Sequence, residues 1–347
     1  MTRASTRPGM ALEGAVHWCF HRGMLRFVGI VFVVAASLVM LQEDSVAADR
    51  PALPDFDSLW NYSAPDSTEA TFRALLPQAK SSGDHDYLAQ LLTQIARAEG
   101  LQQKFDAATK TLDEAEALIA DDMKVARVRL LLERGRVLNS SKRRERAGPL
   151  FERAWDLARA TGADGYAVDA AHMLGIVSPG DSSIAWNRKA LALAEQSSDP
   201  KARRWLGSLY NNMGWTHHER KDYAAALDHF EKALAARRLE GKPPEIRIAR
   251  WCVARALRSL GRTEEALSAQ IALLEEHRAA GTQDGFVEEE IAECLLSLGR
   301  RDEAKPHFAA AFEALAKDPW LTRDEPERLE RLRRLGGVPA PAPTTPK

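Results

Sequence analysis

The sequence predicts an all-α protein made of about six helical hairpins stacked side by side, with a helix capping each end. Three observations support this prediction. Ala, Leu, Glu and Arg, which favour helices, dominate the chain after its first 45 residues or so. Short breaks rich in Gly, Pro, Ser and Asp separate the helical segments about once every forty residues. The segments, aligned on one another, repeat a pattern of small and large residues.

The first part of the chain has the pattern of a secretory signal. Residues 27–41 (FVGIVFVVAASLVML) carry no charge, Arg22 and Arg26 lie upstream, and Val46-Ala47-Ala48 follows. A positive flank, a short apolar stretch and a small-residue exit are typical of signal peptides, whereas a membrane-spanning helix needs about 20 residues. The pattern therefore predicts cleavage after Ala48.

We accordingly expect residues 1–48 to be a leader that directs export to the periplasm or the outside of the cell. Met24 would give the charged region a normal length, which would make residues 1–23 an extension from a mis-assigned start. Two alternatives stay open: an uncleaved leader that anchors the protein in a membrane through residues 27–41, and a cytoplasmic protein.

The leader is followed by three further regions. Residues 49–66 contain several prolines and no helical period, so we expect a linker whose aromatic side chains pack on the first helix. Residues 67–335 form the helical repeat domain. Its capping helices are expected near residues 68–79 and 324–335, because the ends of a stack need polar outer faces. Residues 336–347 are rich in Pro and Thr, which predicts a disordered tail.

The clearest repeat is residues 205–238, WLGSLYNNMGWTHHERKDYAAALDHFEKALAARR. Its small residues Gly214 and Ala226 would let the two helices of a hairpin approach closely, and Phe230 would fill the space between hairpins. Equivalent positions in the successive second helices are Ala108, Ala147, Ser183, Ala226, Ala266 and Ala304. The copy around Ser183 fits least well.

Across residues 84–316 this series resembles the tetratricopeptide-repeat family, and the copy around Gly214 is its most specific match. The resemblance implies a right-handed α-solenoid, in which the first helices of the hairpins line a concave groove that holds peptides or partner proteins. The chain departs from the family pattern because four first helices lack the Gly and Gln270 stands where the Phe is expected. HEAT-like or other helical-hairpin repeats are the alternative.

The register of the repeats predicts which side chains line that groove. One position in successive first helices reads Arg97, Arg136, His172, Trp215, Arg255 and Glu293. The adjacent positions read Thr93, Asn139, Asn211, His218, Trp251 and Arg258. Arginine can hold carboxylates in two-point contacts and tryptophan can cover apolar side chains, so we expect a protein or peptide ligand with acidic character. The alternative is that these arginines pair with carboxylates of neighbouring repeats.

Other classes of function have weaker support in the sequence. The net charge of −1 gives no reason to expect nucleic acid or an anionic membrane as partner. The sequence has no nucleotide-binding or HExxH motif, and the spacing of Cys19, Cys252 and Cys294 does not suit zinc, so we expect no cofactor and no metal. The adjacent histidines His217 and His218 point about 100° apart on a helix and cannot easily share one ion.

The sequence therefore predicts a non-enzymatic scaffold that binds a protein or peptide. One alternative is a cytoplasmic regulatory or sensor module of a signalling system. Another is an enzyme with a hydrolytic site built from His172, His217 and His218. An enzyme would require these histidines to converge with carboxylates in one deep pocket.

Overall fold

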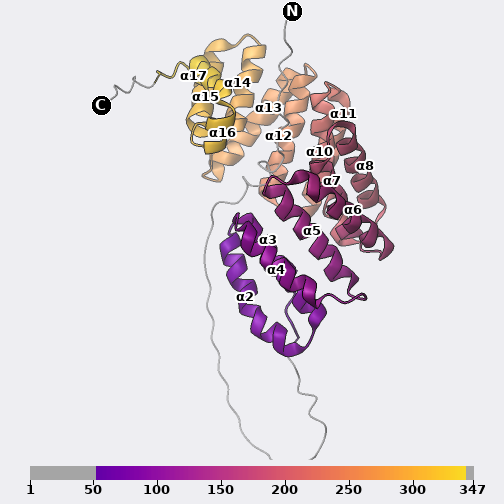
Figure 1. The fold of residues 1–347 in the computed structure, drawn as a ribbon. Helices are drawn as coiled ribbons and strands as arrows, with labels where there is room; N and C mark the ends of the chain where they lie inside the picture. The colour runs from indigo at the N-terminus through magenta and orange to yellow at the C-terminus, as the bar shows by residue number, and fades with distance from the viewer. Residues whose placement is uncertain (1–51, 341–347) are drawn as a thin grey trace, which may run out of the picture. The chain divides into compact units, whose positions relative to one another are not determined.

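The computed structural model describes residues 52–340 and divides the chain into two compact units, between Pro179 and Gly180. All regular structure in the described residues is helical, with no strand, which confirms the all-α prediction. The helices follow one another as antiparallel hairpins (Figure 1). The leader expected at residues 1–48 lies outside the described residues, as do residues 341–347 of the expected tail.

Unit 1 contains a short 3₁₀ helix and six α-helices. These are η1 (Phe56–Leu59), α2 (Pro65–Ser82), α3 (His85–Leu101), α4 (Phe105–Leu118), α5 (Lys124–Ser140), α6 (Arg144–Ala160) and α7 (Asp164–Val177). The hairpins α3–α4 and α5–α6 form its centre, α2 packs on α3 at one end, and α7 packs on α6 at the other. The helix α2 is thus the N-terminal cap that the sequence predicts.

Unit 2 contains the remaining helices in the described part of the chain. These are α8 (Gly180–Gln196), α9 (Pro200–Arg203), α10 (Leu206–Glu219), α11 (Tyr223–Glu240), α12 (Pro243–Ser259), α13 (Thr263–Ala279), α14 (Gly285–Ser297), α15 (Arg301–Leu315), α16 (Pro319–Asp324) and α17 (Pro326–Gly336). The hairpins are α10–α11, α12–α13 and α14–α15; α8 packs against α10 and α17 against α15. The helix α17 is the predicted C-terminal cap, and it includes Gly336, one residue beyond the predicted end of the domain.

The second helices of the hairpins, here called the B helices, are α4, α6, α8, α11, α13 and α15. The residue predicted at each equivalent position, from Ala108 to Ala304, is the fourth residue of its B helix, including Ser183. The eighth residue of each B helix is buried in every case: Leu112, Phe151, Asn187, Phe230, Gln270 and Phe308. The structure therefore confirms the register of the second helices that the sequence predicts.

The first helices, here called the A helices, are α3, α5, α7, α10, α12 and α14. Each carries a small residue at the equivalent sequence position: Ala96, Gly135, Ala171, Gly214, Ala254 and Ala292. At Gly135 and Gly214 a Cβ atom would come within 2.4 Å and 2.5 Å of the rings of Phe151 and Phe230. Contact this close has no room for a methyl group, so only glycine fits at these two positions.

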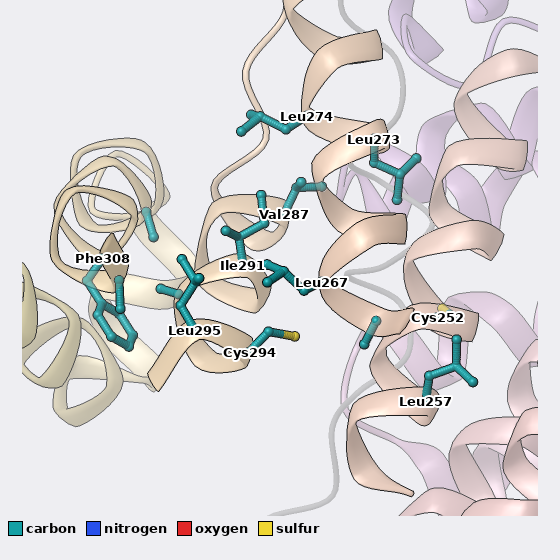
Figure 2. Close-up of a cluster of buried hydrophobic side chains, with 14 of the residues drawn as sticks. Cys252, Leu257, Leu267, Leu273, Leu274, Val287, Ile291, Cys294, Leu295 and Phe308 are labelled. Carbon is teal, nitrogen blue, oxygen red and sulfur yellow. The ribbon is translucent and has the colours of Figure 1, made fainter. Parts of the chain in front are cut away.

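The core of unit 2 shows how the hairpins hold one another. Figure 2 shows Cys252 and Leu257 of α12, Leu267 of α13 and Ile291 of α14 among the apolar side chains that fill the space between these helices. Burial of such side chains from neighbouring hairpins is the main stabilising contribution to a helical repeat stack. Cys252 and Cys294 are both buried free thiols.

Polar side chains and glycines mark the ends of several helices. Asp84 accepts a hydrogen bond from the backbone N–H of Tyr87 at 2.9 Å and so caps α3. At the other end of a helix, Gly241 ends α11 with a φ of 71°, a left-handed conformation that glycine adopts without strain. In the described part of the chain, no helix is both long and apolar enough to cross a membrane.

Candidate functional site

The A helices of unit 1 carry a row of charged side chains that pair from helix to helix. Arg97 of α3 lies 3.2 Å from Glu133 of α5, and Arg136 of α5 lies 2.6 Å from the same carboxylate. Arg136 also contacts Asp169 of α7. We call Arg97, Glu133, Arg136, Asp169 and His172 the A face of unit 1. These contacts join Arg97 and Arg136 through the shared carboxylate of Glu133, so the two arginines lie close together.

The A face of unit 1 neutralises its own charge. Two guanidinium groups, of Arg97 and Arg136, meet two carboxylates, of Glu133 and Asp169. The side chain of Glu133 is only 4% exposed and lies between both arginines. An incoming carboxylate would have to displace an internal one, and breaking a buried ion pair is costly. In unit 1 the arginines therefore pair with carboxylates of neighbouring repeats, which is the alternative to ligand binding given above.

His172 completes this row on α7. Burial lowers the pKa of its imidazole to about 4; Asp169 opposes this shift and Arg136 adds to it. The ring is therefore neutral at physiological pH. A neutral imidazole beside two balanced ion pairs gives this face no excess charge of either sign.

The A helices of unit 2 present aromatic side chains instead. The indole rings of Trp215 on α10 and Trp251 on α12 lie 6.0 Å apart between centroids, and both residues are half-buried. Trp215 also packs edge-on against Phe230, 5.1 Å away. Trp251 donates its Nε1–H to the backbone oxygen of Phe286 on α14 at 3.1 Å, which fixes the orientation of its ring. The two rings therefore form a rigid aromatic surface, and the indole N–H of Trp251 already has a hydrogen-bond acceptor.

Next to these rings, two arginines share a single carboxylate. Arg255 Nε lies 3.0 Å from Glu290 Oε1, and Arg258 makes a two-point contact with Glu290 at 2.8 and 2.9 Å. Arg255 also donates to Ser259 Oγ at 3.0 Å. Burial lowers the pKa of Arg255 although Glu290 opposes the shift, and Arg258 lowers it further. Two guanidinium groups therefore share one carboxylate in direct contact, while Glu289 and Glu293 of α14 also act on Arg255 electrostatically.

His218 and Asn211 of α10 border the same spot. His218 Nε2 lies 2.9 Å from Ser259 Oγ, and its ring lies 5.2 Å from that of Trp215. Burial, together with the guanidinium groups of Arg255 and Arg258, lowers the pKa of His218 to about 4. Asn211 accepts a hydrogen bond from Cys252 Sγ at 3.3 Å. The residues that we call the A face of unit 2 are Asn211, Trp215, His218, Trp251, Arg255, Arg258 and Glu290.

In unit 2, further ion pairs join α14 to α17, and they involve residues that the sequence did not single out. Glu289 of α14 contacts Arg328 of α17 at 2.5 Å, and Glu293 of α14 contacts Arg331. The spacing of Arg328 and Arg331, three residues apart, puts both on one helix face and was a usable signal. Glu293, predicted as a groove residue, is therefore engaged by the C-terminal cap.

Several sequence-based candidates prove to lie elsewhere. Thr93 is completely buried and donates to the backbone oxygen of Gln90 at 2.6 Å, so it cannot line a surface. His217 points away from His218: its ring stacks on His229 of α11 at 5.0 Å, and its Nδ1 lies 3.2 Å from Asp222. The two adjacent histidines thus belong to different faces. Within residues 52–340 no cluster of His, Cys, Asp or Glu could hold a metal ion.

Comparisons with known proteins agree with this architecture. The sequence profile of the tetratricopeptide repeat matches residues 180–238, which span α8 to most of α11. A comparison with curated proteins found no significant match.

Three solved structures share the fold. BtubC (BKLC) from P. vanneervenii is similar with a TM-score of 0.51 and 14% identity, covering 67% of this chain and 94% of that one. A signal-transduction ATPase with numerous domains and a tetratricopeptide-repeat sensor, from Pyrococcus horikoshii, has a TM-score of 0.60 at 13% identity, covering 78% and 44%. The Cut9–Hcn1 heterotetramer of the APC/C has a TM-score of 0.52 at 14% identity, covering 78% and 47%.

This chain spans less than half the length of the last two, and at such identities the similarity speaks for the fold alone. The hairpin register and the close contacts at Gly135 and Gly214 are consistent with the repeat type that the profile detects in residues 180–238. Residues 180–238 match the tetratricopeptide-repeat profile, and the fold of the described residues is similar to that of solved tetratricopeptide-repeat structures.

Proposed function

We propose that this protein is a non-enzymatic scaffold that binds an extended segment of a partner protein on the A face of unit 2. Tetratricopeptide-repeat proteins are protein-interaction scaffolds in general, which supports the class of function. The observation that supports this particular face is the pair Arg255 and Arg258, which share the single carboxylate of Glu290 beside two half-buried tryptophans.

The chemistry of this face suggests the ligand. A carboxylate placed near Arg255 and Arg258 would relieve the sharing of Glu290 by two guanidinium groups, and a guanidinium can hold it in a two-point contact. An adjacent apolar or aromatic side chain would cover Trp215 and Trp251, whose rings are large and rigid. We therefore propose a partner segment in which an acidic side chain, or a C-terminal carboxylate, lies next to an apolar residue.

The A face of unit 1 is a poorer candidate for an acidic ligand. Arg97 and Arg136 are already balanced by Glu133 and Asp169, so an added carboxylate would meet no net positive charge there. The acidic preference expected from the sequence is thus proposed for unit 2 only.

The test compares two double variants of the full chain that remove the same amount of positive charge. Arg255→Glu with Arg258→Glu should abolish capture of the partners that the wild-type protein retains from host lysate. Arg262→Glu with Arg300→Glu is the matched control, because both arginines are about half exposed and pair only with a glutamate three residues on in their own helix. Circular dichroism should show both variants folded. Equal capture by the two variants would remove the A face of unit 2 from the explanation.

The leader bears on the compartment in which the protein acts. We propose export by the leader, which predicts a mature N-terminus at Asp49 in the periplasmic or secreted fraction. The alternative is a cytoplasmic sensor module, for which the chain would keep its leader in the cytosol. Cell fractionation followed by N-terminal sequencing separates the two proposals, since each names a different compartment and a different first residue.

A further inference from the structure

A segment of the chain itself lies against the A helices of unit 1. We call residues 54–62 (PDFDSLWNY) the strap. Tyr87 of α3 donates its hydroxyl to the backbone oxygen of Pro54 at 2.9 Å, and Trp60 donates its Nε1–H to Gln94 of α3 at 3.1 Å. Tyr87, Gln94 and Arg97 are seven and three residues apart, so they lie on one face of α3. The residues expected to be a linker are therefore bound along the face that was expected to bind a ligand.

The first half of the strap is firmly anchored. Phe56 is 6% exposed and packs edge-on against Phe72 at 6.3 Å and Tyr87 at 5.1 Å. Asp57 pairs with Arg129 of α5, whose side chain is 5% exposed. The Arg129 guanidinium also lies 5.2 Å from the ring of Phe56 and 5.1 Å from that of Tyr166 on α7. One buried arginine thus connects the strap to two further A helices.

The second half of the strap covers Arg97 and is held more lightly. The rings of Trp60 and Tyr62 stack at 4.6 Å, and the Arg97 guanidinium lies 5.9 and 5.6 Å from their centroids. Tyr62 is 51% exposed. Trp60 also packs edge-on against Phe72 of α2 at 5.2 Å. Contacts between a guanidinium and an exposed ring are weak, so Tyr62 can separate from α3 more easily than the buried Phe56.

These contacts have the character of peptide recognition. The face of α3 and α5 holds a segment built around the single 3₁₀ turn of η1, through one backbone oxygen, one carboxylate and aromatic rings. The other side of the segment packs on Phe72 of α2. The order of the contacts defines a spacing: a carboxylate, then aromatic rings three and five residues later, at Asp57, Trp60 and Tyr62.

We propose that the strap is an intramolecular ligand of unit 1, and that a partner segment with a carboxylate followed by aromatic residues at positions +3 and +5 competes for the same face. The direct connection of the strap to α2 gives it an effective concentration in the millimolar range or above. The face is therefore closed until a partner outcompetes the strap. This inference concerns residues of unit 1 only, so it does not depend on the site proposed in unit 2.

The experiment releases the strap from its tether at the turn where Asn61 is hydrogen-bonded to Ser63 and Ala64, and it leaves the contacts of Phe56, Asp57 and Trp60 in place. A protease recognition sequence is inserted between Tyr62 and Ser63 of the full chain, and binding of a fluorescein-labelled synthetic peptide of residues 52–62 is followed by anisotropy before and after cleavage. The uncut protein should not bind the peptide. The cut protein should bind it, and a peptide with Asp57→Asn and Trp60→Ala should bind at least tenfold more weakly, because it lacks the partners of Arg129 and Gln94.

Two outcomes would overturn the inference. If the cut protein loses its helical circular dichroism, or if it stays folded and never binds the labelled peptide, the strap is a fixed structural cap. Hydrogen exchange of the uncut protein gives an independent reading: the amides of residues 54–62 should exchange together and faster than those of α3. Exchange of strap and helix at one common rate would contradict a strap that can be replaced.

Discussion

The ring of Phe230 occupies the space into which a side chain on Gly214 would project. A Cβ atom at residue 214 would lie 2.5 Å from two of the ring carbons, far inside van der Waals contact. Phe230 is completely buried and also packs against Trp215 of the A face of unit 2. The contact between glycine and phenylalanine therefore sets both the closeness of the hairpin α10–α11 and the position of a proposed binding residue.

Gly214→Ala should destabilise the protein in spite of the better helix propensity of alanine. Alanine favours a helix by up to about 1 kcal/mol over glycine, whereas overpacking a buried ring costs about 1–3 kcal/mol. We expect a net loss of about 1–2 kcal/mol in the free energy of unfolding, measured with urea. Gly100→Ala is the control, because a Cβ there would meet only Val137 at an ordinary 3.6 Å. Equal effects of the two substitutions would contradict the packing argument.

Gln270→Met should stabilise the protein. Gln270 takes the place that Phe230 and Phe308 fill in the neighbouring hairpins, and it is completely buried. Its Oε1 atom has no hydrogen-bond donor among the described residues, and its Nε2 reaches the Trp251 backbone oxygen only at 3.5 Å. A buried, unsatisfied polar atom costs about 1–3 kcal/mol, so replacing the amide with an apolar side chain of similar length should gain about 1–2 kcal/mol.

The measurement is again the free energy of unfolding in urea. Gln196→Met, at the exposed end of α8, is the matched control and should stay within about 0.5 kcal/mol of the wild type. A stabilised control, or a destabilised Gln270→Met, would mean that the amide of Gln270 is satisfied in solution.

Asp57→Asn should destabilise unit 1 far more than the same change in a surface pair. Asp57 pairs with Arg129, whose side chain is 5% exposed, and its loss would leave a buried cation without its partner. Such a loss costs about 3–5 kcal/mol when both groups are buried; because Asp57 is itself partly exposed, we expect about 2–3 kcal/mol. Asp113→Asn also removes a carboxylate 2.6 Å from an arginine, Arg134, but at 63% exposure, and should cost under about 1 kcal/mol.

Thermal or urea unfolding of both asparagine variants gives the comparison. A loss at Asp57 no larger than that at Asp113 would show that the strap contributes little to holding unit 1 together.

The repeating helices could be predicted from the sequence because their signal is local and occurs many times. Each B helix repeats a small residue at its fourth position and a buried one at its eighth, so one clear copy around Phe230 set the register even where Ser183 or Gln270 departs from it. The division of the chain between Pro179 and Gly180 leaves no comparable mark, since the short break there resembles the others.

The A faces were harder to predict because their meaning depends on pairs of side chains rather than on single positions. The register named Arg97 and Arg255 as candidates. It did not name Glu133 and Glu290, the carboxylates that pair with them. The contact between Asp57 and Arg129 joins residues 72 positions apart, and no periodicity connects them. A carboxylate between aromatic residues in a segment rich in proline was the only sequence signal for the strap.

Stability should fall as the pH drops below about 6.5, because His172 and His218 are kept neutral in the folded protein. Their pKa values are lowered to about 4: burial is the main cause for both, with Arg136 contributing at His172 and Arg255 and Arg258 at His218. Asp169 opposes the shift of His172 but does not overcome it. Between pH 6.5 and 4 the unfolded chain binds protons that the folded one does not, so the free energy of unfolding decreases over this range.

Urea unfolding at pH 7.5 and pH 5.0 measures the effect, which is at most about 2 kcal/mol for each histidine over this interval. The variant His172→Gln with His218→Gln should lose correspondingly less stability between the two pH values, since glutamine does not titrate. His85→Gln, at an exposed position at the start of α3, is the control and should follow the wild type. An acid-induced loss that is the same in all three proteins would show that His172 and His218 are not the responsible groups.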